Sequence, residues 1–182
     1  MPQLFRPPNL LTCVRIVLTP VIVLALMRND CERAFWLSLF AGFTDAADGY
    51  LARLMGESSR LGAYLDPIAD KLLLTALYIC FGAAGLAPLW LVYLVVGRDA
   101  MILSLVAAGY LWKGIRDFPP SIWGKLSTLL QIATALGVIS LCSFGVAPGV
   151  VQVLLYATAA ATFWSGLHYF LRAVASIRYV SR

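Results

Sequence analysis

The chain has 182 residues, of which 61% are hydrophobic and 13% are charged, and its formal net charge is +5. Soluble domains contain about 45–50% apolar and about 25% charged residues, so this composition excludes a soluble fold, a disordered chain and a secreted disulfide scaffold. The positive charge indicates a partner such as anionic lipid headgroups or a phosphate-bearing substrate, and we expect no nucleic-acid partner.

Apolar runs separated by glycines, prolines and charged residues predict six membrane-spanning helices. A spanning helix needs about 20 apolar residues, which leaves room for roughly six spans and for no separate soluble domain. The expected spans are residues 9–28, 33–56, 61–82, 87–111, 122–144 and 148–171. We therefore expect an all-α integral membrane protein in which residues 1–182 form a single domain.

The basic residues predict the orientation of these spans. The third and fifth loops contain no Lys or Arg, and Asp30 and Glu32 offset the basic residues of the first loop. Most of the other basic residues gather at the two termini and around the second and fourth loops, as Arg6, Arg53, Arg60, Lys113, Arg116, Lys125, Arg172, Arg178 and Arg182. The positive-inside rule then places both termini in the cytoplasm. We expect a protein of the bacterial inner membrane, with both termini and the second and fourth loops facing the cytoplasm.

The cysteines are spread singly along the chain and form no CxxC pair. They are Cys13, Cys31, Cys80 and Cys142, and three of them fall within apolar runs. This spacing favours small, buried side chains over a redox or metal motif.

Acidic residues mark the candidate site, because an ionisable group at membrane depth is costly and usually functional. Those within the expected spans are Asp45, Asp48, Asp66, Asp70 and Asp99. The first two lie one helical turn apart on the second span, and the next two do so on the third, so each pair shares a helix face. Small residues on both stripes allow close packing. Since the connecting loop is short, we expect antiparallel helices whose four carboxylates converge near the cytoplasmic ends.

Four converging carboxylates repel one another unless some are protonated or cations lie between them. Oxygen ligands favour Mg²⁺, Mn²⁺ or Ca²⁺, and two such ions side by side suit an in-line phosphoryl displacement. The alternative is a set of buried ion pairs with Arg53, Arg60 and Lys71, which is an unfavourable way to hold helices together.

These residues spell the pattern D-x2-D-G-x2-A-R-x8-G-x3-D-x3-D, from Asp45 to Asp70. The pattern resembles the signature of the CDP-alcohol phosphatidyltransferase family, which are integral membrane enzymes of phospholipid synthesis. The segment Asn9-Leu-Leu-Thr12-x2-Arg15 is similar to the opening segment of that family. The resemblance covers most of the chain, although the last two spans match only in character.

The resemblance implies roles for individual residues. Asp45, Asp48 and Asp66 would bind two divalent ions, Mg²⁺ or Mn²⁺, while Asp70 would complete the metal site and act as the catalytic general base. The resemblance also implies a binding site for CDP-diacylglycerol. Gly49 would leave room for the nucleotide, Ala52 and Gly62 would line its pocket, and Arg53 would hold a phosphate. Weaker candidates for nucleotide contacts are Ser59, Asn9 and Thr12. A homodimer is also implied, because family members are commonly dimeric.

The implied reaction is attack of an alcohol on the β-phosphorus of CDP-diacylglycerol, with release of CMP. The segments around Asp66-Pro67, Arg98-Asp99 and Gly124-Lys125 are similar to the branch that makes phosphatidylglycerophosphate or cardiolipin. Phosphatidylglycerophosphate synthases typically carry a second arginine later in the fourth span, where this chain has Val106. We therefore favour phosphatidylglycerol as the anionic acceptor, with phosphatidylglycerophosphate synthase, acting on glycerol 3-phosphate, as the alternative.

The candidates for binding the acceptor are Arg98, Arg116 and Lys125, although Arg98 and Asp99 could equally form an internal ion pair. Two rival classes are a membrane prenyltransferase and a divalent-cation transporter. The first has its aspartate clusters far apart in sequence, and the second needs polar residues across the whole membrane. The outer halves of these spans are apolar, which argues against an ion pathway.

Overall fold

The computed structural model describes residues 7–55, 60–113 and 121–180, and the side chains of residues 14–44, 71–105, 107–108 and 121–173. These ranges form the helices α1 (Pro7–Met27), α2 (Cys31–Met55), α3 (Arg60–Ala83), α4 (Leu89–Lys113), α5 (Ile122–Phe144) and α6 (Pro148–Val180). Each expected span coincides with one helix, and α6 continues beyond the apolar run. The described residues contain no strand, so the all-helical fold is confirmed.

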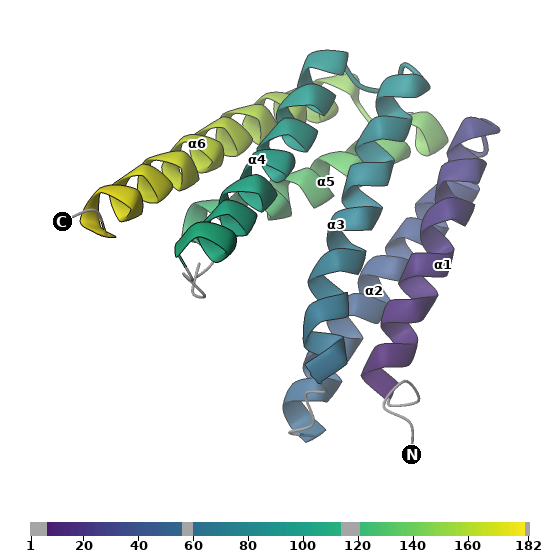
Figure 1. The fold of residues 1–182 in the computed structure, drawn as a ribbon. Helices are drawn as coiled ribbons and strands as arrows, with labels where there is room; N and C mark the ends of the chain where they lie inside the picture. The colour runs from purple at the N-terminus through teal and green to yellow at the C-terminus, as the bar shows by residue number, and fades with distance from the viewer. Residues whose placement is uncertain (1–6, 56–59, 114–120, 181–182) are drawn as a thin grey trace.

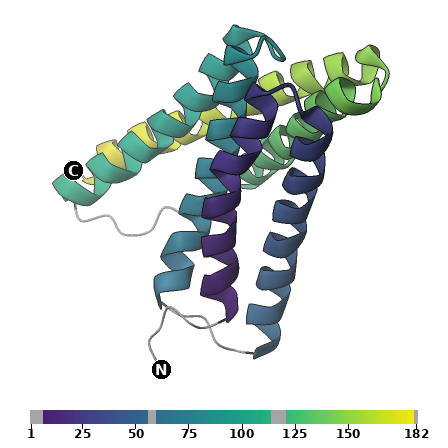
Figure 2. The ribbon, with the colours of Figure 1, turned by 90° about the vertical axis from the view of Figure 1, so that its right-hand side faces the viewer.

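The helices form two groups that pack against each other, α1 to α3 and α4 to α6 (Figure 1). In the first group α1 packs against both α2 and α3, and in the second α6 packs against α4 and α5. The groups meet through α2 with α5 and through α3 with α4 and α5. The α1–α2, α3–α4 and α5–α6 turns gather at the end where the groups meet (Figure 2). The last turns of α2 and the first turns of α3 lie at the opposite end of the first group.

Capping residues mark where α5 begins and ends. Ser121 precedes α5 with an extended backbone, and its hydroxyl accepts the backbone N–H of Gly124 at 3.0 Å, which caps the helix. Gly145 ends α5 in the left-handed region, at φ 65°, and donates its N–H to the carbonyl of Leu141. Between α1 and α2, Asn29 takes φ 59°, a conformation that Asn tolerates better than most side chains.

A disulfide joins Cys31, at the start of α2, to Cys142, in the last turn of α5. The Cα atoms of the two cysteines lie 5.8 Å apart, across a sequence separation of 111 residues. The expectation that these cysteines are unpaired buried side chains is therefore wrong, because the fold brings together two helices that are distant in sequence. Cys80 is a free, buried cysteine as expected, whereas the side chain of Cys13 lies outside the described residues.

The described side chains include many exposed apolar residues and several buried polar ones, although the core itself is apolar. Large apolar side chains such as Val17, Phe43 and Tyr93 are exposed, whereas Arg15, Gln131 and Thr158 are buried. Lipid as the surrounding solvent accounts for this pattern, because apolar surface is stable there and polar groups must pair internally. Among the described residues, Ile122–Phe144 and Pro148–Ala173 are long and apolar enough to cross a membrane.

Candidate active site

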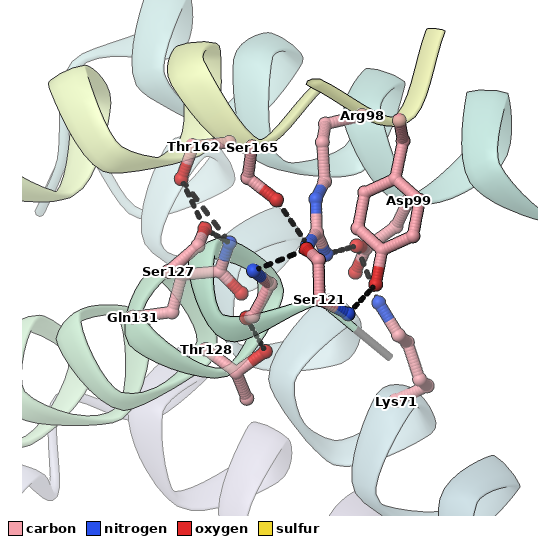
Figure 3. Close-up of polar contacts among 11 residues, drawn as sticks. Lys71, Arg98, Asp99, Ser121, Ser127, Thr128, Gln131, Thr162 and Ser165 are labelled. Atoms are coloured by element: carbon pink, nitrogen blue, oxygen red, sulfur yellow. Dashed lines mark hydrogen bonds and ion pairs between the residues drawn. The ribbon is translucent and has the colours of Figure 1, made fainter. Parts of the chain in front are cut away.

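A buried ion cluster connects α3, α4 and α6. The guanidinium of Arg98 donates from Nη1 to Oδ1 of Asp99 at 2.6 Å, and Nζ of Lys71 forms an ion pair with the same oxygen (Figure 3). The side chains of Arg98 and Asp99 are 6% and 8% exposed, whereas that of Lys71 is 40% exposed. The internal ion pair that the sequence left open is thus present, and it also includes Lys71.

Two residues of α6 hold the other side of the Arg98 guanidinium. Its Nη2 donates to Oγ of Ser165 at 2.7 Å, and its Cζ lies 5.8 Å from the centre of the Tyr169 ring. The hydroxyl of Tyr169 accepts the backbone N–H of Ser121 at 2.8 Å, which connects the start of α5 to the cluster. A Cβ at Gly124 would lie 2.9 Å from this hydroxyl, so only glycine permits the close approach.

A recess of about 450 Å³ opens beside this cluster, and Lys71, Arg98, Lys125, Thr128 and Tyr169 contribute to its walls. Three of these side chains are cationic, and Asp99 neutralises one of the three charges. A partly buried site with excess positive charge attracts anions strongly, because low surrounding polarity strengthens the electrostatic interaction. The recess therefore favours a phosphate-bearing ligand.

A row of polar side chains, which we call the polar seam, holds α5 against α6. Nε2 of Gln131 lies 3.3 Å from Oγ of Ser127 and 3.2 Å from Oγ1 of Thr162. One turn further along, the hydroxyls of Thr134 and Thr158 are 2.7 Å apart. Such bonds stabilise helix pairs in lipid, where few alternative partners exist. The seam also holds the α6 backbone that carries Ser165, and thus supports Arg98 (Figure 3).

The residues of the aspartate motif lie on two helices that the structure describes. Asp45, Asp48, Gly49, Ala52 and Arg53 belong to the last turns of α2, and Gly62, Asp66 and Asp70 belong to the first turns of α3. Their side chains lie outside the described residues, as do those of Asn9 and Thr12 on α1 and of Val106 on α4. Ser59 and Arg116 lie outside the described residues altogether.

The described side chains contain no group of three or more His, Cys, Asp or Glu that could hold a metal ion. The donor set of the motif does fit such an ion, because four carboxylates supply the hard oxygen ligands that Mg²⁺ and Mn²⁺ prefer. The predicted arrangement of these carboxylates therefore stays a prediction.

Sequence reasoning missed several groups near this site. Arg15 is 1% exposed on α1 and lines a cavity with residues of α2, α3 and α5, although the sequence marked it only as part of an opening segment. The partners of Arg98 on α6 were also missed. The polar seam had a detectable signal, since Ser127, Gln131 and Thr134 recur at helical spacing, as do Thr158, Thr162 and Ser165.

Replacing Asp99 with asparagine is expected to destabilise the protein, because two cations would then lack their shared counter-charge. Breaking a buried ion pair costs about 3–5 kcal/mol of unfolding free energy. The measurement is unfolding of the purified protein in detergent, with Asp30→Asn as the control, since Asp30 is exposed. If both variants lost the same small amount, the cluster would contribute nothing to stability.

The sequence matches the CDP-alcohol phosphatidyltransferase family over residues 5–164. It is 41% identical over 105 residues to the cardiolipin synthase (CMP-forming) / mitochondrial hydrolase fusion protein of Schizosaccharomyces pombe, covering 58% of this chain and 18% of that protein. It is also 41% identical over 100 residues to the cardiolipin synthase (CMP-forming) of Rattus norvegicus, covering 54% of this chain and 33% of the relative. The chain thus spans less than two thirds of these two relatives.

A third relative is the "Probable phosphatidylglycerophosphate synthase" of Mycobacterium tuberculosis. The chain is 34% identical to it over 175 residues, which cover 93% of this chain and 82% of the relative. The match to the family extends from the first helix into the sixth and includes every position of the aspartate motif. The chain therefore belongs to the CDP-alcohol phosphatidyltransferase family.

Proposed function

We propose that the protein transfers the phosphatidyl group of CDP-diacylglycerol to a hydroxyl of phosphatidylglycerol, forming cardiolipin and CMP. The observation that carries this proposal is the complete aspartate motif on α2 and α3, inside the region that matches the family. Similarity to cardiolipin synthases, at 41% identity for two of them, supports the choice of acceptor.

In this proposal Asp45, Asp48, Asp66 and Asp70 hold two divalent metal ions. When bound, these ions neutralise negative charge on the diphosphate and on the departing CMP. Gly49, Ala52 and Gly62 leave space for the nucleotide, and Arg53 pairs with a phosphate. Asn9, Thr12 and Ser59 are weaker candidates for nucleotide contacts.

The chemical step needs a base, because an alcohol is a poor nucleophile at neutral pH. The carboxylate of Asp70 accepts the hydroxyl proton while the hydroxyl oxygen attacks the β-phosphorus. A new phosphorus–oxygen bond forms as the bond to CMP breaks, and CMP leaves as an anion. Placing the site near the ends of α2 and α3 suits a donor whose acyl chains remain in the bilayer.

The surroundings of Arg98 support a lipid acceptor. Its guanidinium is bonded to Asp99 and Ser165, so much of its hydrogen-bonding capacity is used within the protein. A phosphodiester carries one negative charge and needs fewer donors than the dianion of glycerol 3-phosphate. Lys125, which is exposed at the recess, is the best placed cation to bind the phosphodiester of the acceptor. Arg116 is a further candidate for this role.

Phosphatidylglycerophosphate synthase remains the second candidate function. It is favoured by the longest of the three alignments, which covers 93% of this chain. The two functions share the donor, the metal site and the base, and they differ only in the acceptor.

An acceptor assay separates the two functions. Purified protein supplied with labelled CDP-diacylglycerol is expected to form cardiolipin and CMP from phosphatidylglycerol. Glycerol 3-phosphate is expected to bind about ten- to a hundredfold less tightly, because a phosphate deprived of one charge-assisted hydrogen bond loses roughly 1.5–3 kcal/mol. Faster conversion of glycerol 3-phosphate at matched concentrations would establish the second function instead.

We also propose six spans, with both termini and the motif end of α2 and α3 in the cytoplasm of a bacterial inner membrane. The disulfide supports this orientation, because disulfides persist in the periplasm and are rare in the cytosol. Cys31 and Cys142 lie beside the α1–α2 and α5–α6 turns, which the basic residues assign to the outer side. A homodimer, with α3 and α4 as candidate contacts, belongs to the same proposal.

Thiol labelling tests the orientation. In the Cys31→Ser variant, Cys142 loses its partner and is exposed, so a membrane-impermeant maleimide added to intact spheroplasts is expected to label it. The wild-type protein is expected to stay unlabelled until it is reduced, and buried Cys80 serves as the internal control. Labelling that required lysis of the spheroplasts would reverse the orientation.

A further inference from the structure

A large apolar cavity lies between α2, α3 and α5. It has a volume of about 840 Å³, and its walls include Phe40, Leu73, Leu77, Ile132 and Leu136. Its polar lining residues are Arg15, Ser38 and Thr128, which come from three different helices. The hydroxyl of Thr128 already donates to the carbonyl of Gly124. The cavity therefore offers the walls of an acyl-chain site.

Water is a poor occupant of this cavity. Ser38 is 9% exposed, and its Oγ has no hydrogen-bond partner among the described residues. A buried water needs two to four polar partners, whereas the residues that follow Ser38 on the lining are Leu39 and Phe40, and the other polar lining residues, Arg15 and Thr128, lie on other helices. Leaving the space empty would forfeit the dispersion contacts of every lining side chain. An apolar chain in the cavity would make more favourable contacts with the lining side chains than water or an empty space would.

The cavity adjoins the cationic recess described above. Thr128 and Ile132 line both spaces, so one wall of α5 runs from the recess into the apolar cavity. Lys71, Arg98 and Lys125 lie at the recess end, and Asp99 is the acidic partner of the first two. The two adjoining spaces, which we together call the lipid slot, thus have a positive end at the recess and an apolar end at the cavity.

The length of the lipid slot matches one leaflet of a bilayer. Its wall on α5 extends from Thr128 to Ile139, which corresponds to about 16 Å of helix at 1.5 Å per residue. Half of the hydrocarbon core of a bilayer measures about 15 Å. Lys125 lies just before this wall, where the headgroup of a lipid in that leaflet would be found.

We propose that the lipid slot binds the acceptor phospholipid, with one acyl chain in the apolar cavity and the phosphodiester at Lys71 and Lys125. This inference rests on the proposed function, and it adds that the acceptor is selected by its chain as well as by its charge. A water-soluble acceptor such as glycerol 3-phosphate makes no contact with the apolar part. The lipid slot therefore explains how a protein with the aspartate motif can prefer a lipid hydroxyl.

Filling the cavity tests this inference. Leu136→Trp places a large side chain in the cavity, and Leu73→Trp does so from α3 in case the first variant fails to fold. The control is Leu24→Trp, because Leu24 is 55% exposed and lines neither space. We expect the filled variants to raise the KM for phosphatidylglycerol at least tenfold, with kcat within twofold and an unchanged KM for CDP-diacylglycerol.

An acceptor without acyl chains sharpens the test. Glycerophosphoglycerol has the phosphodiester headgroup but no chain, so its conversion is expected to be the same in wild-type and filled variants. A raised KM for CDP-diacylglycerol instead would assign the cavity to the donor and overturn the inference. Unchanged kinetics for phosphatidylglycerol in both filled variants would also overturn it, while leaving the proposed function in place.

Lipid retention tests the lipid slot without any turnover. Native mass spectrometry of the chelator-treated protein, given phosphatidylglycerol and phosphatidylcholine together, is expected to show retained phosphatidylglycerol in the wild type and the Leu24→Trp control only. Because this measurement needs no turnover, retention of phosphatidylglycerol by a protein that converts glycerol 3-phosphate faster would contradict the proposed function, whereas conversion of phosphatidylglycerol without selective retention would contradict the lipid slot. Equal retention of both lipids by all variants would overturn the inference.

Discussion

Replacing Asp66 with asparagine is expected to abolish nearly all turnover. The change removes one of the four negative charges proposed to hold two divalent ions, and an amide binds Mg²⁺ and Mn²⁺ less well than a carboxylate. The same loss is expected for Asp45→Asn and Asp48→Asn, with a decrease in activity of at least about a hundredfold. Release of CMP from CDP-diacylglycerol in the presence of phosphatidylglycerol is the measurement.

Metal removal should reproduce the effect of these substitutions in the wild-type protein. Activity is expected to vanish with excess chelator and to return with Mg²⁺ or Mn²⁺, whereas the Asp66→Asn variant should need higher metal concentrations for any residual rate. Asp30→Asn is the matched control, because Asp30 is an exposed acid in the α1–α2 turn. Full wild-type activity in excess chelator would contradict a metal-dependent mechanism.

The helices were predictable because the hydropathy of the chain follows a simple pattern. Long, predominantly apolar runs predict helices of spanning length, and the breaks between them carry Gly, Pro or charges. The prediction for α5 agrees with the structure at both ends, since Ser121 caps its start and Gly145 ends it. The prediction for α6 stopped early because hydropathy falls near Arg172, yet a helix can continue past the apolar region into polar surroundings.

The contacts between helices were not predictable in the same way. Periodicity shows which face of a helix is polar, but it does not show which other helix that face meets. Cys31 and Cys142 are 111 residues apart, and only the packing of α2 on α5 makes them partners. Arg98 likewise meets Ser165 because α4 packs on α6. The aspartate motif was recognisable because its spacing is local, within two helices that are adjacent in sequence.

Replacing Asp70 with asparagine is expected to separate binding from chemistry. Asparagine keeps nearly the same volume but cannot accept the hydroxyl proton, so the alcohol remains a poor nucleophile. Turnover is expected to fall by at least about a hundredfold, the lower range for acid–base groups. Binding of CDP-diacylglycerol, measured by calorimetry in detergent, should remain close to that of the wild type.

The contrast with Asp66→Asn makes this prediction specific. Both variants lose one carboxylate from adjacent turns of α3, so a purely structural or purely metal-binding role for Asp70 predicts the same weakened metal affinity in the two. A base at Asp70 instead predicts a large loss of kcat that added metal does not restore, together with a lost dependence of kcat on pH. If metal restored the rate of Asp70→Asn, the carboxylate would serve only as a ligand and the base would lie elsewhere. A low rate that added metal does not restore, together with a lost dependence of kcat on pH, is the result expected if the proton of the acceptor hydroxyl passes to Asp70.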